Sequence, residues 1–178
     1  PVAIDPTLQT EATTSNEGLY CTYVREGAPD TSHPKYQELY FGYSSSSSKE
    51  HRVFMHLATM PSIPADSIVT DAILGMYLYD YSRVTTNNLP TAIYEVTEEK
   101  PETSSTYKSW INYMTWNTQP EYDTNNAIDY VNIKYQMGGK YLHWDVTELI
   151  KKWYATGEEN RTFAMAITEG KQAWSSTY

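Results

Sequence analysis

The side chains that could carry acid–base or nucleophilic chemistry are scattered along this 178-residue chain. A hydrolase or lyase needs paired carboxylates, or a nucleophile beside its base. The four histidines, His33, His51, His56 and His143, form no His-x-His or His-x-x-x-His motif. No Gly-x-Ser-x-Gly motif, glycine-rich phosphate loop or EF-hand sequence is present either. We therefore predict no catalytic site and expect that the protein is not an enzyme.

The remaining reactive groups have ordinary structural interpretations. Cys21 is the only cysteine, and its place in an expected strand favours a small packing residue over a nucleophile. A single cysteine excludes an internal disulfide, which fits a bacterial exported protein or a cytosolic one. His143 alternates onto the same side as Tyr141 and Asp145. We interpret it as a solvent-facing or hydrogen-bonded imidazole.

Several carboxylates near strand ends could contribute to a site for a structural calcium ion. Loop carboxylates and backbone carbonyls often hold calcium in jelly-roll modules. The candidate ligands are Asp71, Asp80, Asp123, Asp129 and Asp145. Their spacing alone does not assemble a site, so the sequence assigns no metal ligand and no other cofactor.

Aromatic and planar polar side chains are the residues that could bind a ligand. The chain holds 17 Tyr and 5 Trp but only 3 Phe. Sugar C–H faces stack on aromatic rings, and sugar hydroxyls bond to amide, carboxylate or guanidinium groups. The candidate ligand-binding residues are Tyr77, Tyr79, Tyr81, Arg83, Trp110, Tyr113, Tyr130 and Asn132. Trp116, Trp144 and Trp153 are interpreted as core residues instead.

Short alternating segments must position these side chains. The expected strands span residues 20–26, 36–43, 51–58, 68–80, 91–97, 128–135, 140–146 and 161–168. Both faces of 68–80 are apolar or aromatic, which indicates a central strand, although Tyr77 and Tyr79 could lie on an exposed face. Met137-Gly138-Gly139 indicates a hairpin. Because no βαβ alternation occurs, we predict an all-β, antiparallel two-sheet sandwich with jelly-roll-like topology.

One short α-helix is expected near residues 147–156. Leu149, Ile150 and Trp153 form an apolar stripe at helical spacing. Asp145 or Thr147 could cap the first turn, and Gly157 could supply a left-handed stop.

The net charge of the chain narrows the classes of partner that we expect it to bind. A formal net charge of −9 disfavours nucleic acid, because an acidic surface repels phosphates. A polyanion would need a local basic patch, whereas neutral glycans or cations fit the charge directly. No apolar run approaches the length of a membrane span, so membrane insertion is not expected.

The order of several motifs resembles one family from about residue 20 onward. The most specific are the Thr-Trp-Asn-x-x-Pro segment 115–120, Asp145-Val146-Thr147, and Trp153 followed by Gly157. Supporting pieces are 23–30, 39–43, 52–55, 57–61, Ile68, 71–74, Trp110 and Asn160. The chain resembles the DNRLRE-type β-sandwich domains of bacterial surface and secreted proteins, including Rhs/YD-repeat proteins, which are related to a family of carbohydrate-binding modules. The namesake string is absent, and Arg52-Val53-Phe54-Met55 is only a loose counterpart.

The resemblance also sets expectations for the domain boundaries. Residues 1–19 are interpreted as a lead-in, a linker or an edge strand, and residues 20–178 as the domain. The family usually ends with one further strand, which this sequence does not reach. An open sheet edge is a pairing hazard, so we expect another segment or chain to cover it.

Two functions from different classes remain open. The first is a non-catalytic extracellular module that binds a polysaccharide or cell-wall glycan, or attaches to a cell surface, within a larger secreted bacterial protein. The second is a purely structural spacer with no small-molecule ligand. Exposed aromatic rings on a sheet face would favour the first, and burial of Tyr77, Tyr79 and Trp110 would favour the second.

Overall fold

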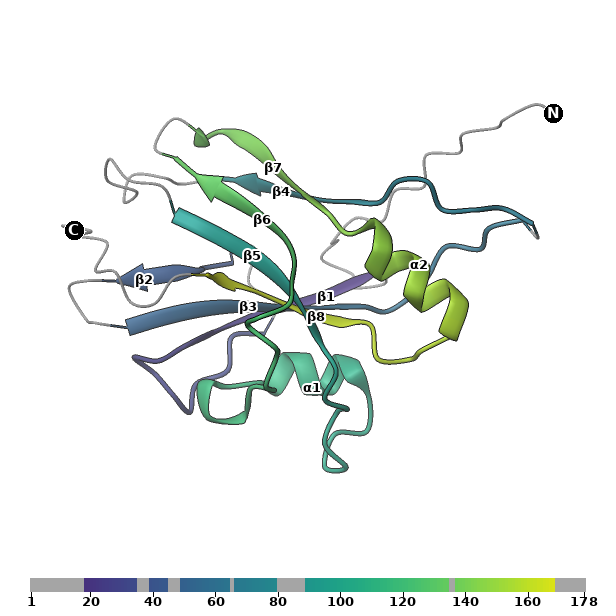
Figure 1. Cartoon of the computed structure of the whole chain (residues 1–178). Coiled ribbons are helices and arrows are strands. Elements are labelled where there is room, and N and C mark those ends of the chain that lie inside the picture. Colours follow the sequence, from purple (N-terminus) through teal and green to yellow (C-terminus); the bar gives the residue numbers. More distant parts are fainter. Residues whose placement is uncertain are drawn as a thin grey trace.

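The computed structural model describes residues 18–34, 39–44, 49–64, 66–79, 89–134 and 137–168. Within these residues the chain forms mainly strands, with three short helical segments (Figure 1). The strands are β1 (Leu19–Arg25), β2 (Gly42–Ser44), β3 (Lys49–Leu57), β4 (Ile73–Leu78), β5 (Leu89–Val96), β6 (Ala127–Ile133), β7 (Lys140–Asp145) and β8 (Thr162–Ile167). The helices are α1 (Tyr107–Tyr113), the 3₁₀ turn η1 (Trp116–Thr118) and α2 (Thr147–Thr156).

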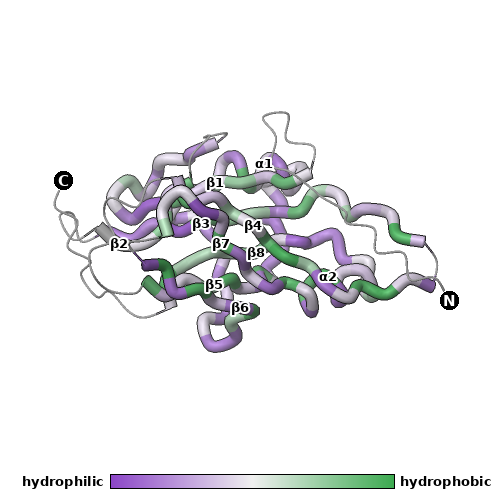
Figure 2. The backbone as a smooth tube through the Cα atoms, turned by 90° about the horizontal axis from the view of Figure 1, so that it is seen from above, coloured by the Kyte–Doolittle hydropathy of each residue, from purple (hydrophilic) through white to green (hydrophobic). Residues whose placement is uncertain are grey.

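The strands form two antiparallel sheets. The large sheet has the order β1-β3-β8-β5-β6, with β2 paired to the first part of β3. The small sheet consists of β4 and β7. Seen from above, β4 and β7 lie over the strands of the large sheet (Figure 2). The predicted all-β sandwich is therefore confirmed.

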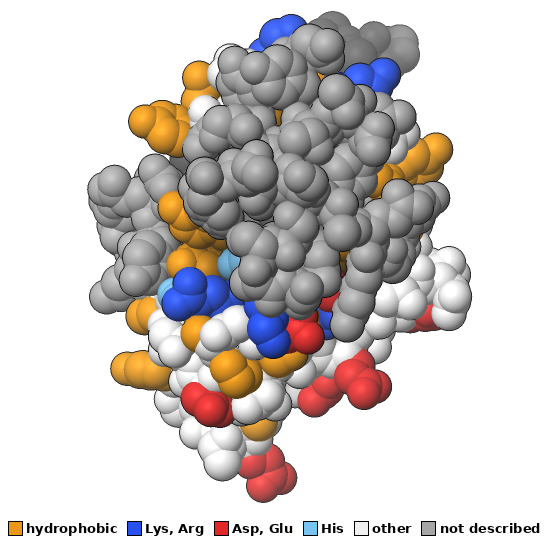
Figure 3. Space-filling model, turned by 90° about the vertical axis from the view of Figure 1, so that its left-hand side faces the viewer, with side chains coloured by type: hydrophobic (Ala, Val, Ile, Leu, Met, Phe, Trp, Pro, Cys, Tyr) orange, Lys and Arg blue, Asp and Glu red, His pale blue; other side chains and the backbone are white. Residues whose placement is uncertain are grey.

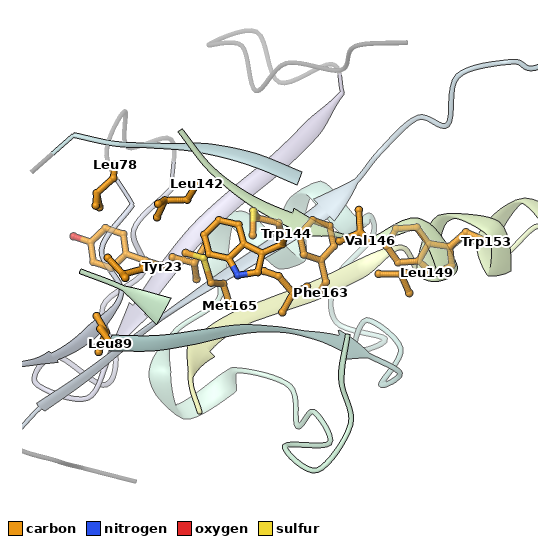
Figure 4. Packing of buried hydrophobic residues seen from close by; sticks show 14 residues of the cluster. Tyr23, Leu78, Leu89, Leu142, Trp144, Val146, Leu149, Trp153, Phe163 and Met165 are labelled. Carbon is orange, nitrogen blue, oxygen red and sulfur yellow. The ribbon is translucent and has the colours of Figure 1, made fainter. Parts of the chain in front are cut away.

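The core between the sheets follows from strand alternation. Val53 and Met55 of β3 and Phe163 and Met165 of β8 point toward the small sheet. Trp144 of β7 lies fully buried among them, as Figure 4 shows. Since a buried indole N–H needs a partner, its Nε1 donates to the Thr91 carbonyl 3.0 Å away. This bond ties the small sheet to β5.

The opposite face of the large sheet is covered as well. Phe54, Ala164 and Ala166 point away from the small sheet and form a second buried cluster with α1. Trp110 and Ile111 supply the buried side of α1. The two alanines leave room for these larger side chains, so the large sheet is a middle layer (Figure 1).

Helix α2 matches the predicted helix in position and in its stop signal. The Asp145 carboxylate accepts the Thr147 amide of the first turn at 2.9 Å. Leu149 and Trp153 are buried against the core. Gly157 adopts a φ of 67° and donates its N–H to the Trp153 carbonyl, a left-handed cap that glycine forms without steric cost.

Two expectations about the strands were wrong. The segment 68–80 is not central, because β4 pairs with β7 alone in a two-stranded sheet among the described residues. The Met137-Gly138-Gly139 turn does not close a hairpin, because β6 pairs with β5 whereas β7 pairs with β4. The chain changes sheets at this turn.

Two further differences concern the lengths and kinds of element. The expected strand 36–43 is reduced to the short β2, and residues 35–38 lie outside the described part. Helix α1 lies between the expected strands 91–97 and 128–135, where no helix was expected. Residues 1–17 and 169–178 are also outside the described part, so the expected lead-in and the covering of an open edge remain predictions.

Candidate functional site

The outer face of the small sheet carries a group of exposed rings. In the β4–β7 register, Tyr77 lies opposite Tyr141 and Gly75 lies opposite His143. Since paired residues of antiparallel strands share a face, all four lie on the side away from the core. Tyr77 is 52% exposed and Tyr141 is 64% exposed. Tyr79, two residues beyond Tyr77, continues the alternation and is 74% exposed. We call Gly75, Tyr77, Tyr79, Tyr141 and His143 the aromatic face.

The rings of this face contact one another in a defined arrangement. The Tyr77 and Tyr141 rings meet edge to face, with centroids 5.3 Å apart. The Tyr141 and His143 rings are nearly parallel, with an interplanar angle of 7° and centroids 6.4 Å apart. Such contacts restrict the rotamers of exposed rings, which lowers the entropy lost when a ligand binds.

Gly75 provides the floor beneath two of these rings. A Cβ atom placed on Gly75 would lie 3.5 Å from Cδ2 of His143 and 4.0 Å from Cδ1 of Tyr141. Both rings thus reach across the strand pair into the space above the glycine. A glycine inside a strand costs stability, and it often marks a place where another group approaches the backbone closely. Here it lets the two rings lie low on the sheet.

The aromatic face ends in polar groups that are already partly engaged. Asp145, opposite the exposed Ile73, follows His143 on the same face. Hydrogen bonds from Thr147 hold the pKa of the Asp145 carboxyl below its usual range. The Asp145 amide in turn donates to Oδ2 of Asp129 in β6, at 2.7 Å. This bond joins β6 to β7, two strands that are not paired by backbone hydrogen bonds.

The other candidate residues do not join this face. Tyr130 and Asn132 are exposed on β6, and Tyr130 lies opposite Ala92, whose side chain belongs to the cluster on the α1 side of the large sheet. Tyr113 is exposed at the end of α1. Trp110 is only 4% exposed and packs in the core. Tyr81 and Arg83 lie outside the described residues.

The motifs that carried the family resemblance hold the fold together. The Arg52 guanidinium forms a double hydrogen bond with the Glu50 carboxylate, at 2.8 and 2.9 Å, and lies 4.6 Å from the centre of the Trp116 ring. Its third contact is Oε1 of Gln119, at 3.1 Å. Asn117 donates to the Asp30 carboxylate at 2.8 Å. These bonds fasten η1 to β3 and to the turn after β1.

The end of the sandwich at the left of Figure 1 carries a second group of rings. Figure 3 shows Lys or Arg side chains, histidine and hydrophobic side chains together on this end. The buried Tyr23 ring stacks on His33, with centroids 4.2 Å apart, and meets Tyr40 edge to face. Burial, followed by the positive charge of Arg25, lowers the pKa of His33 and of His51. Tyr23 and His33 are buried in this group, whereas Tyr40 is partly exposed.

Two described groups that could act as a nucleophile or a base have strongly shifted pKa values. Burial raises the pKa of the Cys21 thiol to about 12, so it is protonated at neutral pH and is a poor nucleophile. Burial also lowers the pKa of His56 to about 4. Within the described residues, no three His, Cys, Asp or Glu side chains are grouped to hold a metal ion. Asp123, one candidate ligand, instead accepts hydrogen bonds from Asn125 and Asn126.

The sequence predicted two of the four rings of the aromatic face. Tyr77 and Tyr79 were candidate residues, whereas Tyr141 and His143 were not. The alternation of residues 141, 143 and 145 was visible in the sequence. What was missing was the β4–β7 register, which brings Tyr141 beside Tyr77.

The comparisons with known proteins are consistent with these features. A family model described as carbohydrate-binding module family 96 matches residues 19–177. A search among curated proteins finds no match. In the described part of the chain, no helix is long and apolar enough to cross a membrane.

Proposed function

The chain belongs to carbohydrate-binding module family 96, and we propose that it binds glycan by stacking sugar rings on the aromatic face. The observation that carries this proposal is the exposure of Tyr77, Tyr79 and Tyr141 on one side of a two-stranded sheet. Large exposed rings that lie together are costly to solvate and usually mark an interaction site.

The chemistry of the face fits carbohydrate. Sugar C–H groups pack against aromatic rings, and the remaining hydroxyls can bond to nearby polar groups such as the Tyr hydroxyls and His143. The flat floor at Gly75 keeps the Tyr141 and His143 rings low, which suits a flat ligand. Burial of Trp110 removes one candidate from this surface, but the spacer alternative required Tyr77 and Tyr79 to be buried too.

We further propose that the module is non-catalytic and works outside the cell, as part of a secreted or surface protein of bacterial origin. Membership of a family of binding modules supports the first part. The single cysteine and the resemblance to DNRLRE-type domains support the second. We also propose that another segment of the protein, or a second chain, covers an open edge of the sheet.

A glycan array tests the proposed function, with neutral and acidic polysaccharides as separate arms. Tyr77→Ala and Tyr141→Ala should each weaken binding about tenfold, which corresponds to one lost stacking contact of about 1.4 kcal/mol. Tyr130→Ala is the matched control, because it removes an equally exposed ring from the other side of the large sheet.

Each outcome separates the alternatives. If Tyr130→Ala abolishes binding and Tyr77→Ala does not, the binding surface lies on β6 and the aromatic face is excluded. If no glycan is bound at all, the chain is a structural spacer and the proposal fails.

A further inference from the structure

The rings of the aromatic face follow the strands instead of enclosing a pocket. Tyr77 with its partner Tyr141, and His143 opposite Gly75, lie on two successive levels of the small sheet. Tyr79, the residue after the end of β4, continues the alternation as a third level. Each level is two residues from the next, and a strand rises about 3.3 Å per residue, so the rings cover roughly 13 Å. That length exceeds one pyranose ring.

We propose that this face binds the interior of an extended polysaccharide chain, which lies along β4 and β7, and that Gly75 determines whether the chain can approach. The inference rests on the proposed function. A site for a chain end must surround that end with walls on several sides. On the aromatic face the tyrosine side chains are half to three-quarters exposed, so the ligand is held on one side only.

The arrangement of the rings supports a run of adjoining contacts. The nearly parallel Tyr141 and His143 rings present adjacent surfaces along β7, and Tyr77 contacts the Tyr141 ring from β4. A sugar residue that stacks on one level leaves the next level free for its neighbour. Affinity should therefore grow with the number of linked sugars until all levels are occupied.

Gly75 offers a test that removes no ring and no polar group. It has no positive φ, so Gly75→Val should be accepted by the backbone, and valine favours strands. A Cβ on residue 75 would be in ordinary van der Waals contact with the His143 ring, 3.5 Å away, so the further methyl groups of valine would need space that the rings occupy. The rings would be pushed away from the sheet and would no longer form one level surface.

The experiment is a calorimetric titration with oligosaccharides of increasing length, prepared from the polysaccharide that binds best on the array. We expect affinity to rise at least tenfold from the disaccharide to a plateau. Chemical reduction of the terminal sugar of the longest ligand should leave its affinity unchanged. Tyr79→Ala should bring the plateau to a shorter oligosaccharide, and Gly75→Val should lower affinity at least tenfold without lowering the melting temperature.

Three results would overturn the inference. A disaccharide that binds as tightly as the longest ligand would indicate a single-sugar site. Loss of binding after terminal reduction would indicate recognition of chain ends. Full binding by Gly75→Val would show that the rings need no floor. In all three cases glycan is still bound, so the proposed function survives, whereas absence of any binding defeats both.

Discussion

His56 is the histidine whose environment most strongly links protonation to folding. Its side chain is only 3% exposed and stacks on Tyr107 with ring centroids 4.3 Å apart. The Tyr20 ring lies on the same stack, 6.1 Å away, and Nδ1 of His56 is 3.0 Å from Oγ1 of Thr162. Burial, and to a lesser degree the nearby Arg161, lowers the pKa of His56 to about 4. The neutral imidazole is therefore the form that fits the fold.

The shift predicts that acid destabilises the protein. In the unfolded chain a histidine has a pKa of about 6.5, so between pH 6.5 and 4 the unfolded state binds more protons than the folded one. The stabilisation is complete above about pH 6.5 and is lost as the pH falls toward 4. For His56 alone the loss from pH 7 to pH 5 should be about 2 kcal/mol.

Urea unfolding at pH 7 and pH 5 measures this effect. His56→Phe keeps an aromatic ring in the stack and should shrink the difference between the two pH values. A remainder is expected, since His33 and His51 also have lowered pKa values. His143→Gln, which alters an exposed ring, is the control. Equal pH dependence in His56→Phe and the unaltered protein would contradict this account.

At the scale of elements, α2 was predictable because its signals are local. The apolar stripe, the Asp145 carboxylate before the first turn and the glycine after the last turn all lie within one short stretch. Helix α1 has weaker local signals: the Thr106 hydroxyl accepts the Ser109 amide of the first turn, but no glycine follows its last turn. Its seven residues, Tyr107–Tyr113, include three aromatic rings and no acidic residue in the first turn, and aromatic residues are modest helix formers. It is stabilised by the burial of Trp110 and Ile111 on the large sheet, which a local reading of the sequence does not show.

Gly157, which ends α2, allows a direct test of how much a local signal contributes to stability. Gly157→Ala should destabilise the protein by about 1 kcal/mol, because an L-residue other than glycine is strained at a φ of 67°. Nothing lies within 4 Å of the added Cβ, so a clash cannot contribute. Thermal unfolding measures the change, and Gly157→Asn should recover part of it, since asparagine tolerates this conformation. An unchanged melting temperature in Gly157→Ala would show that the cap does not limit stability.

The misjudged position of β4 has a physical reason. Ile73, Tyr77 and Tyr79 made its outer face apolar or aromatic, and such a face normally lies beneath another layer. In the structure that face is exposed. A sequence rule that fails at a cluster of exposed rings is the pattern expected at a functional surface. The residues that suggested a buried central strand are therefore the same residues that form the proposed binding face.

At the scale of the molecule, the layers separate the residues that maintain the fold from those free to bind. The large sheet is buried on one side by the small sheet and on the other by α1. The family motifs join these layers through Arg52, Asn117 and the Asp145 amide, which donates to Asp129 of β6. Strand patterns predicted this sandwich, because alternate residues must pack inward. They did not predict which strands pair, because the turn at Gly138 and Gly139 fits both a hairpin and a change of sheet.

The central claim is that glycan binds the outer face of β4 and β7. Backbone amide NMR spectra, recorded while the polysaccharide that binds best on the array is added, test it most directly. The account predicts that the largest shift changes fall in residues 73–79 and 140–145. Largest changes in β6 and α1, or at the end of the sandwich that carries Tyr23 and His33, would contradict it.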